Sequence, residues 1–334
     1  MAEKNPGMSA SYDEHSTVQM AANQRHISLV LEALKQVDRP DEVLTVADFG
    51  SATGLNSIKT FSPAFQAFRL TSQTPIWVYH CDLPTNPWSV LFTNVLSSPH
   101  SYLSLPHVYT AAVGRSFYSR LFPANSVSVG YTTFSLHWLS THSQAQDQLE
   151  KFVQSDPQFH AELRARSNQD LDTFLTHRAA ELRPGGRLVL HMITDVIAHK
   201  PRYDTLLEME REGLISHEPL RRFPVHVYHS TPELLTQAVA RQPHLQLLSI
   251  ESVRLYDPLY QQFLADGDAA EFGRQVAKHS KAVSENIFLD LFREEASPKD
   301  LVDTLFQKTE KWYATHPEPL LTQEVDAVIG QLRT

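Results

Sequence analysis

The sequence predicts an α/β fold in which strands and helices alternate along most of the chain. Apolar runs of strand length recur through residues 1–193, and segments with a 3.6-residue apolar period separate them. The turn after the first of these strands is small and polar and contains two glycines, as at the ligand crevice of open α/β sheets. A chain of 334 residues accommodates one such domain with insertions.

Composition and charge narrow the classes of partner. The chain is 42% apolar, carries a net charge of −9 and has no block of basic residues, which argues against a nucleic-acid partner. No apolar run approaches the ~18 residues of a membrane span, and residues 1–11 lack the apolar core of a signal peptide. The only cysteine, Cys81, excludes an intrachain disulfide and a cysteine metal cluster. We therefore expect a cytoplasmic protein without a membrane partner.

The first regular element is expected to be a helix from Thr17 to Val37. Its apolar stripe, with i, i+3, i+4, i+7 spacing, consists of Ile27, Val30, Leu31 and Leu34. Ser16 is a plausible N-cap and would share a face with Gln19 and Asn23. These polar residues either cap a solvated face or point into a site, and the spacing leaves both interpretations open.

The strand expected at Val43 to Ala47 leads into Asp48, Gly50 and a tight turn. Ala52 occupies the place of the second glycine of Gly-x-Gly-x-x-Gly, which argues against a bound pyrophosphate and favours a smaller ligand. An acid at the strand end suits a cationic ligand such as S-adenosylmethionine (SAM). Many α/β proteins carry Asp-x-Gly after a strand, so other ligands stay open. A helix to about Leu70 is expected next.

A second strand, Ile76 to Asp82, also ends in an acid. In doubly wound sheets the acid after the second strand bonds ribose hydroxyls. Asp82 follows Asp48 by 34 residues, more than the usual interval of about 20, which a long helix and loop between them would explain. The alternative is that Asp82 is only a turn residue before Pro84.

Two further strands are expected at Val108 to Ala112 and at Val127 to Tyr131. The segments after their carboxyl ends, 113–123 and 132–140, are placed to line the ligand crevice. The second segment contains the pair His137-Trp138. Such a pair either packs in the core or takes part in function, and its position keeps the functional interpretation open.

The rest of the chain is expected to interrupt and then resume the alternation. Residues 141–167 are polar and are expected to be irregular. A helix from Asp170 to Leu182, stopped by Pro184-Gly185-Gly186, precedes a strand from Arg187 to Met192. Between Thr194 and Pro232, a helix at 202–213 and an extended piece at 223–228 predict an insertion over the crevice. The remaining expected elements are a helix at 232–239, a strand at 245–253 and helices at 272–292 and 301–312.

These patterns divide the chain into four parts. Residues 1–193 are the first part of the α/β core, with an N-terminal segment that gates the site, and residues 232–256 complete the core. Residues 194–231 are a cap insertion. Residues 257–334 are poor in strand signals and are expected to form a mainly helical C-terminal cap.

Several short motifs occur in the order and register of one known family. They are Ser11-Tyr12 through Ser16 to Gln19, Ala47-Asp48-Phe49-Gly50 through Gly54 to Asn56, Asp82-Leu83-Pro84 with Asn86, Gly114 to Phe122-Pro123, Ser135-Leu136-His137-Trp138-Leu139-Ser140, Phe174 to Gly186, and Lys281-Ala282-Val283 with Glu285. The chain thereby resembles the SABATH methyltransferases, which include the salicylate, benzoate and jasmonate carboxyl methyltransferases. Departures from the family pattern at His15, Ser51, Ala52 and Leu55 are typical of a distant, microbial member. The substrate is therefore not carried over.

The resemblance implies a fold, a cofactor and an activity. The fold is a class I SAM-dependent methyltransferase sheet, Rossmann-like, with a mostly helical cap over the active site. The cofactor is SAM, the partner is a small carboxylic acid, and the assembly is a homodimer. The implied reaction converts the carboxylate of a small organic acid to its methyl ester. Alternatives are an N-methyltransferase of a small heterocycle and a SAM-binding protein with other chemistry; a nicotinamide dehydrogenase lacks its Gly-x-Gly-x-x-Gly here.

The resemblance also assigns roles to individual residues, with no metal ligands among them. The substrate-binding set is Tyr12, Gln19, His137 and Trp138, of which the last three are also assigned to catalysis. The cofactor set is Ser16, Asp48, Gly50, Asn56, Asp82, Leu83, Ser116, Phe117 and Phe134. Lys4 matches a lysine that closes over the site in the family. A carboxylate is ionised at pH 7, so methyl transfer to it requires no general base.

Overall fold

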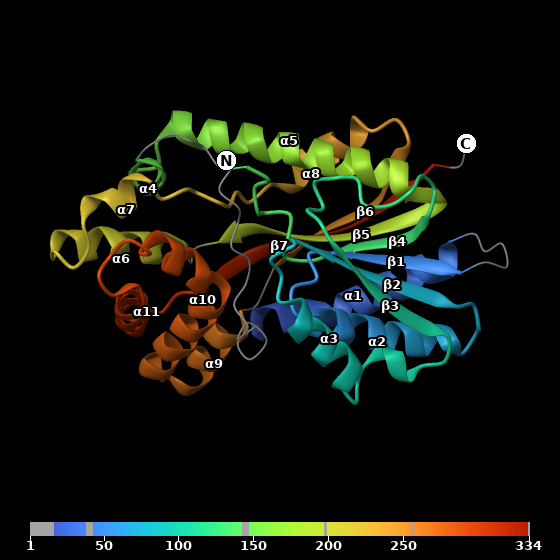
Figure 1. The fold of residues 1–334 in the computed structure, drawn as a ribbon, viewed down its shortest axis with the longest axis horizontal. Coiled ribbons are helices and arrows are strands. Elements are labelled where there is room, and N and C mark those ends of the chain that lie inside the picture. The colour runs from blue at the N-terminus through green and yellow to red at the C-terminus, as the bar shows by residue number, and fades with distance from the viewer. Residues whose placement is uncertain (1–16, 38–42, 142–146, 197–198, 255–256, 333–334) are drawn as a thin grey trace.

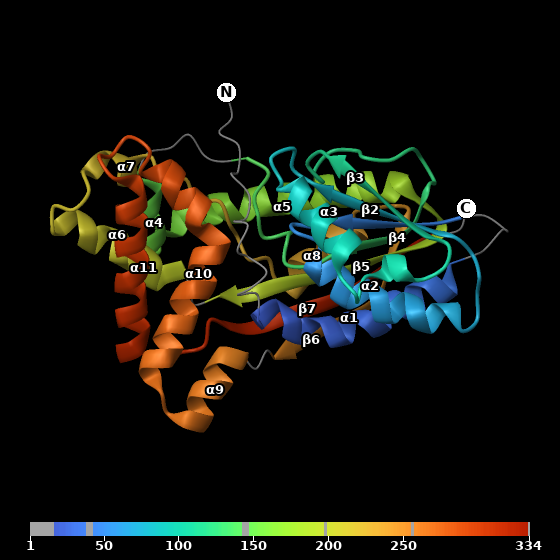
Figure 2. The same cartoon turned by 60° about the horizontal axis from the view of Figure 1, so that its bottom comes forward.

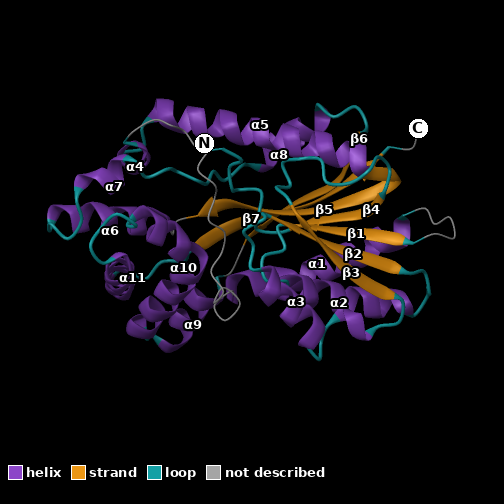
Figure 3. Ribbon diagram, viewed as in Figure 1, coloured by secondary structure: helices purple, strands orange, loops and turns teal. Residues whose placement is uncertain are grey.

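The computed structural model describes residues 17–37, 43–141, 147–196, 199–254 and 257–332. Its centre is a seven-stranded sheet with the order β3-β2-β1-β4-β5-β7-β6 (Figure 1, Figure 3). The strands are β1 (Leu44–Phe49), β2 (Ile76–Asp82), β3 (Val108–Gly114), β4 (Val127–Thr132), β5 (Leu182–Val196), β6 (Leu245–Arg254) and β7 (Leu321–Gln331). The strands β1 to β5 pair in parallel, and β7 lies antiparallel between β5 and β6.

Helices cover both faces of this sheet (Figure 1). On one face lie α1 (Thr17–Gln36), α2 (Leu55–Arg69) and α3 (Trp88–Ser97), and on the other lie α5 (Pro157–Glu181) and α8 (Pro232–Ala240). A short 3₁₀ helix, Tyr102–Ser104, precedes β3. The first face buries Phe61 and Phe65 of α2, and the second buries Phe174 of α5. The predicted α/β fold is therefore confirmed as a doubly wound sheet.

A second group of helices lies at the end of the sheet to which the parallel strands point (Figure 1, Figure 2). It contains α4 (Gln148–Val153), α6 (His199–Arg211), α7 (His217–Arg221), α9 (Pro258–Asp266), α10 (Ala269–Leu291) and α11 (Pro298–Thr315). All of them except α9 contribute to one apolar cluster, which includes Phe223, Phe288 and Phe292. A helical cap thus faces the carboxyl ends of the strands, where ligands of open α/β sheets bind. Among the described helices, none combines the length and hydropathy that crossing a bilayer requires.

The expectation that residues 141–167 are irregular is wrong for most of that segment. It contains α4 and the first turns of α5, which begins at Pro157 with Asp156 as the N-cap. The Asp156 carboxylate accepts the backbone N–H of Phe159 at 2.8 Å. Its buried apolar side chains are Leu149 of α4 and Phe159 and Leu163 of α5, and most of its other residues are polar and face solvent.

The expectation of a mainly helical region at 257–334 misses β7. This strand occupies an interior position in the sheet, between β5 and β6. Its sequence lacks a continuous apolar run because Glu324 and Asp326 interrupt it, although both are buried, at 0% and 5% exposure. Both acids bond Arg25 on α1, about 300 residues earlier in the chain. The sequence around the two acids does not predict partners so far away in the chain. The sequence also gave no sign of α3 (Trp88–Ser97).

Candidate active site

The turn between β1 and α2 requires small residues. Gly50 (φ 88°), Ala52 (φ 45°) and Gly54 (φ 81°) all have left-handed backbone conformations. A Cβ on Gly50 would lie 2.1 Å from the Ser135 Oγ, so a glycine is needed there both for the backbone angle and for space. The backbone N–H of Ala52 donates to the Asp82 carboxylate at 2.8 Å. The turn after β1 and the end of β2 therefore form one surface.

Asp82 lies at the end of β2 as predicted. One carboxylate oxygen accepts the N–H of Ala52, and the other accepts the N–H of Leu83 at 2.7 Å. Burial raises the pKa of Asp82 to about 6, although these two hydrogen bonds favour the charged form. The group is only partly buried by surface area. Two fixed donors orient the carboxylate and leave lone pairs for hydroxyl groups of a ligand.

Asp48 is more deeply buried than its predicted role in cofactor binding requires. Its carboxylate is 2% exposed, accepts the Ser57 hydroxyl and lies 3.1 Å from the Nδ1 of His80. The Nε2 of His80 in turn lies 2.6 Å from the hydroxyl of Tyr102. These contacts brace β1 against α2 and β2. A direct contact of Asp48 with a cofactor stays a prediction.

Two buried polar atoms near the turn have no hydrogen-bond partner among the described residues. They are the Oδ1 of Asn56 and the hydroxyl of Ser51. Asn56 lies in the first turn of α2, directly after the left-handed Gly54. Because buried polar atoms are almost always paired in folded proteins, the Asn56 carbonyl oxygen is a candidate acceptor for a ligand N–H.

The loop after β3 is held by two charged residues of α5. The guanidinium of Arg178 donates to the carbonyl oxygens of Phe117 (2.7 Å) and Ser119 (3.0 Å), and it pairs with Glu181 at 2.9 Å. Glu181 also accepts the N–H of Leu121 at 2.5 Å. Arg178 and Glu181 are each 1% exposed. Sequence reasoning gave neither residue a role.

This loop brings its predicted cofactor residues to the turn. The ring of Phe117 lies 3.7 Å from the position that a Cβ of Gly50 would occupy. The hydroxyl of Ser116 accepts the N–H of Tyr118 at 3.3 Å. Phe134, at the end of β4, has φ 51° and packs against Leu259 and Phe272 of the cap. Phe134 thus joins the core to the cap, and its contact with a cofactor stays a prediction.

The pair His137-Trp138 is fixed between the core and the insertion. Trp138 forms an isolated antiparallel bridge with Val227. The N–H of Tyr228 donates to the carbonyl of His137 at 2.9 Å, and the hydroxyl of Tyr118 donates to the carbonyl of Trp138 at 2.7 Å. The extended piece predicted at 223–228 therefore lies beside the segment after β4. Both side chains remain partly exposed.

The imidazole of His137 is neutral at physiological pH. Its ring lies 5.2 Å from that of His229 in a stacked arrangement, and 5.4 Å from that of Trp138. Burial holds the pKa of His137 well below its usual range, and the neighbouring imidazoles of His229 and His191 add to this effect. A ligand at this position therefore meets an uncharged ring.

The remaining predicted residues are only partly covered by the structure. Lys4, Tyr12 and Ser16 lie outside the described residues. Gln19 lies in the first turn of α1, whose helix is described. The structure brings together the ends of β1, β2 and β4 with Gly50, Asn56, Asp82 and Phe117 at the edge that faces the cap.

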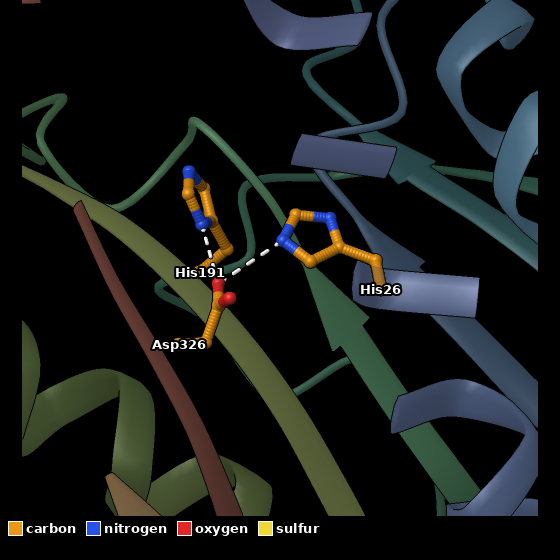
Figure 4. A group of neighbouring side chains, drawn as sticks. All are labelled: His26, His191 and Asp326. Atoms are coloured by element: carbon orange, nitrogen blue, oxygen red, sulfur yellow. Dashed lines mark hydrogen bonds and ion pairs between the residues drawn. The ribbon is translucent and has the colours of Figure 1, made fainter. Parts of the chain in front are cut away.

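A buried polar cluster joins α1 to β5 and β7 (Figure 4). One carboxylate oxygen of Asp326 lies 3.1 Å from the Nε2 of His26 and 2.7 Å from the Nδ1 of His191. The other oxygen accepts the Nε of Arg25 at 2.8 Å, and Arg25 also donates to Glu324. We call these five residues the anchor cluster.

The anchor cluster contains the one set of potential metal ligands found among the described residues. These are His26, His191 and Asp326, whose ligand atoms lie within 4.8 Å of one another. Each imidazole directs one ring nitrogen at Asp326, and Arg25 already supplies a cation to the same carboxylate. The geometry therefore fits a hydrogen-bonded cluster.

Glu324 gives the anchor cluster a measurable pH dependence. Burial raises the pKa of Glu324 to about 7, against the opposing attraction of Arg25. Between pH ~4.5 and ~7 the unfolded chain releases this proton while the folded protein keeps it, so the free energy of unfolding falls as the pH rises. In Glu324→Gln, the decrease in the free energy of unfolding between low and high pH should be smaller by roughly 1–3 kcal/mol. Urea unfolding at pH 5 and pH 8 measures it; equal losses in wild type and variant would contradict the assignment.

A doubly wound sheet whose first turn is small, with an acid after the second strand, is the arrangement in which open α/β sheets bind nucleotide-derived cofactors. The sequence model of the SAM dependent carboxyl methyltransferase family matches residues 3–331. The chain belongs to this family, the SABATH methyltransferases, so it is an enzyme that uses SAM. The predicted family, cofactor and carboxyl methyltransferase activity are thereby confirmed.

Individual relatives support the same assignment. The chain is 26% identical over 363 residues to a probable jasmonic acid carboxyl methyltransferase 2 of Theobroma cacao, with 97% of this chain and 95% of the relative covered. It is 27% identical over 334 residues to indole-3-acetate O-methyltransferase 1 of Oryza sativa subsp. japonica, with 87% and 81% covered. The solved structure of loganic acid methyltransferase with SAH superposes with a TM-score of 0.77 at 19% identity and covers 99% of each chain, which shows a shared fold.

Proposed function

We propose that this enzyme methylates the carboxylate of a small organic acid which it holds with two neutral donors, Gln19 and Trp138. The observation that carries the proposal is the pair His137-Trp138, fixed by backbone hydrogen bonds beside an uncharged imidazole. A carboxylate held by neutral N–H groups keeps its negative charge and its nucleophilicity. A cationic partner would stabilise the anion before the reaction more than in the transition state, where that charge is being lost.

The reaction needs alignment rather than proton transfer. SAM supplies a methyl group on a sulfonium; a carboxylate oxygen forms the new O–CH₃ bond as the S–CH₃ bond breaks, and the electron pair stays on sulfur. The products are a methyl ester and the neutral thioether S-adenosylhomocysteine. The Trp138 indole and the Gln19 amide would orient the two carboxylate oxygens, and His137 would line the same pocket. Well-oriented reactants can save up to about 7–11 kcal/mol of barrier.

The described residues offer a fitting cradle for SAM. The carboxylate of Asp82 would accept hydrogen bonds from the ribose hydroxyls. The unpartnered Oδ1 of Asn56 would accept one from the ammonium group of the methionine part. Gly50 leaves room that a Cβ would fill. We assign the other contacts to Ser16, Asp48, Leu83, Ser116, Phe117 and Phe134. We assign Tyr12 to the substrate pocket and propose that Lys4 closes over the site. The insertion at 194–231 would shape the pocket for the acid.

Asp82 should make SAM binding depend on pH. Since the pKa of Asp82 is about 6, acidification through that value protonates the carboxylate and removes the charged acceptor from the ribose. We expect SAM affinity to fall as the pH is lowered from 7.5 to 5.5, and to change much less in Asp82→Asn, which cannot titrate. Calorimetric titration of both proteins over this range measures the difference; parallel profiles would remove Asp82 from the ribose site.

Product analysis tests the activity directly. The enzyme is incubated with SAM carrying an isotopically labelled methyl group and a panel of small aromatic, cyclopentyl and terpenoid acids, and products are identified by mass spectrometry. The matched controls are the primary amides of the same acids and a set of nitrogen heterocycles. We expect labelled methyl esters from one or a few acids and none from the amides. Label on a heterocyclic nitrogen alone would overturn the proposal.

We further propose that the enzyme is a cytoplasmic homodimer. The chain crosses from β3 to β4 through residues 115–126 without a helix. The outer strands β2 and β3 carry the stacked rings of Trp77, Tyr79 and Tyr109, and Tyr109 is 45% exposed. A second copy would cover this aromatic row. Analytical ultracentrifugation should show a dimer that Tyr109→Glu weakens, and a monomeric wild type would reject it. The single buried cysteine, Cys81, supports a reducing compartment.

A further inference from the structure

The two halves of α1 are attached to the sheet in different ways. From Val30 onward the helix is held by apolar contacts, because Val30 and Leu34 are fully buried in the core beneath the sheet. Ahead of Val30, Ile27 is only partly buried. The described side chains that tie this earlier part to the strands by hydrogen bonds are Arg25 and His26.

The anchor cluster is rigid by its chemistry. The carboxylates of Asp326 and Glu324 in β7 both accept hydrogen bonds from Arg25. The Asp326 carboxylate also makes hydrogen bonds with the imidazoles of His26 and His191. The ring of His26 is also 3.1 Å from the hydroxyl of Tyr131 in β4. Burial alone would raise the pKa of Asp326, but the hydrogen bonds from His191 and His26 hold it well below its usual range. Charge-assisted hydrogen bonds are shorter and stronger than neutral ones, so they fix the groups that they join.

We propose that the anchor cluster is the positioning device for Gln19. His26 follows Gln19 by seven residues, or two helical turns, so both lie along one line of α1. The cluster fixes this line of the helix to β4, β5 and β7, and Trp138 lies in the segment that follows β4. Arg25 and His26 thereby set the distance between the two carboxylate donors. This inference rests on the proposed function, because it gives Gln19 a substrate to hold.

The test is a double-mutant cycle with Arg25→Gln and Gln19→Ala. We expect Arg25→Gln to lower kcat/KM for the acid by about 10- to 100-fold, the scale of a 1 Å misplacement, with SAM affinity unchanged. In the Gln19→Ala background, Arg25→Gln should change kcat/KM by less than about twofold, because its target is already gone. Arg25→Lys, which keeps the charge, should recover part of the loss. A full Arg25 effect in the Gln19→Ala background would overturn the proposal.

Two further measurements keep the inference separate from the proposed function. Hydrogen exchange of the α1 backbone amides at 17–24 should accelerate in Arg25→Gln whether or not an acid substrate has been found, and unchanged exchange would overturn the anchor. Gln19→Ala with wild-type efficiency would instead reject the donor role of Gln19. The matched control is Arg241→Gln, which breaks an exposed pair with Asp172 at 2.8 Å and should leave exchange in α1 and kcat/KM unchanged.

Two controls address folding and metal binding. If Arg25→Gln does not fold, His26→Gln provides the same cycle, since it removes one hydrogen bond to Asp326 and keeps Arg25. Zinc titration of the wild-type enzyme with calorimetry should show no stoichiometric site. Tight 1:1 binding of zinc that His191→Ala abolishes would overturn the anchor and make the cluster a metal centre.

Discussion

Replacing Arg178 by methionine is expected to lower the free energy of unfolding by about 3–5 kcal/mol. The substitution leaves Glu181 charged, buried and without its cation. It also removes the donors to the carbonyl oxygens of Phe117 and Ser119, and the guanidinium that lies 4.3 Å from the centre of the Phe49 ring. Urea unfolding followed by circular dichroism measures the loss.

Two comparisons assign that loss to the lone charge. Arg178→Met combined with Glu181→Gln should recover part of the stability, because glutamine still accepts the backbone N–H of Leu121 without a charge. Arg241→Met, which breaks the exposed pair with Asp172, should cost less than about 1 kcal/mol. An Arg178→Met protein as stable as Arg241→Met would show that the buried pair contributes nothing to the loop after β3.

The second large effect concerns Trp138→Phe. Phenylalanine keeps most of the packing of the ring and deletes only the indole N–H. Catalytic efficiency toward the acid should fall by the worth of a hydrogen bond to a charged group, roughly 1.5–3 kcal/mol or about 10- to 150-fold. The fold and the affinity for SAM should survive, since Trp138 is held through its backbone by Val227 and Tyr118.

Steady-state kinetics and unfolding on the same variant separate the two interpretations of Trp138. If Trp138 only packs, Phe will lower stability and leave the efficiency of each folded molecule unchanged. Near-wild-type efficiency would reject Trp138 as a donor and reopen nitrogen methylation as the chemistry. Tyr118→Phe is the matched control, because it loses the hydrogen bond to the backbone carbonyl of Trp138 but keeps the indole.

Sequence patterns located the strands best where an apolar run ends in a turn residue. The strand predicted at 76–82 coincides with β2, and that predicted at 245–253 falls one residue short of β6. The first of these runs has a clear end at Asp82. The strand β7 was missed because its buried acids interrupt the apolar pattern, and their compensation comes from Arg25 and His26 at the other end of the chain.

The candidate site divides in the same way. The positions of Gly50 and Asp82 could be predicted, because a tight turn and an acid at the end of a strand are both recognised from the neighbouring residues alone. The role of Arg178 could not be predicted, because its partners at Phe117 and Ser119 are about 60 residues away in the sequence. These partners are backbone carbonyls, which every residue has, so the residue types give no hint of the contact. Long-range polar contacts depend on the folded topology, so they emerge only from the structure.

The place of β7 in the sheet also bears on how the protein is made. The strand β7 follows all the other described strands in the sequence, yet it is not an edge strand but the partner of both β5 and β6. Until residues 321–331 are synthesised, β6 has no neighbour, and Arg25, 301 positions before Asp326, has no acid to bind. Contacts of such sequence separation form late and slowly. The hydrogen bonds that tie α1 to β7 therefore form only after β7 has been made, and a chain that stopped just before Leu321 would carry an unfinished sheet rather than form a shortened enzyme.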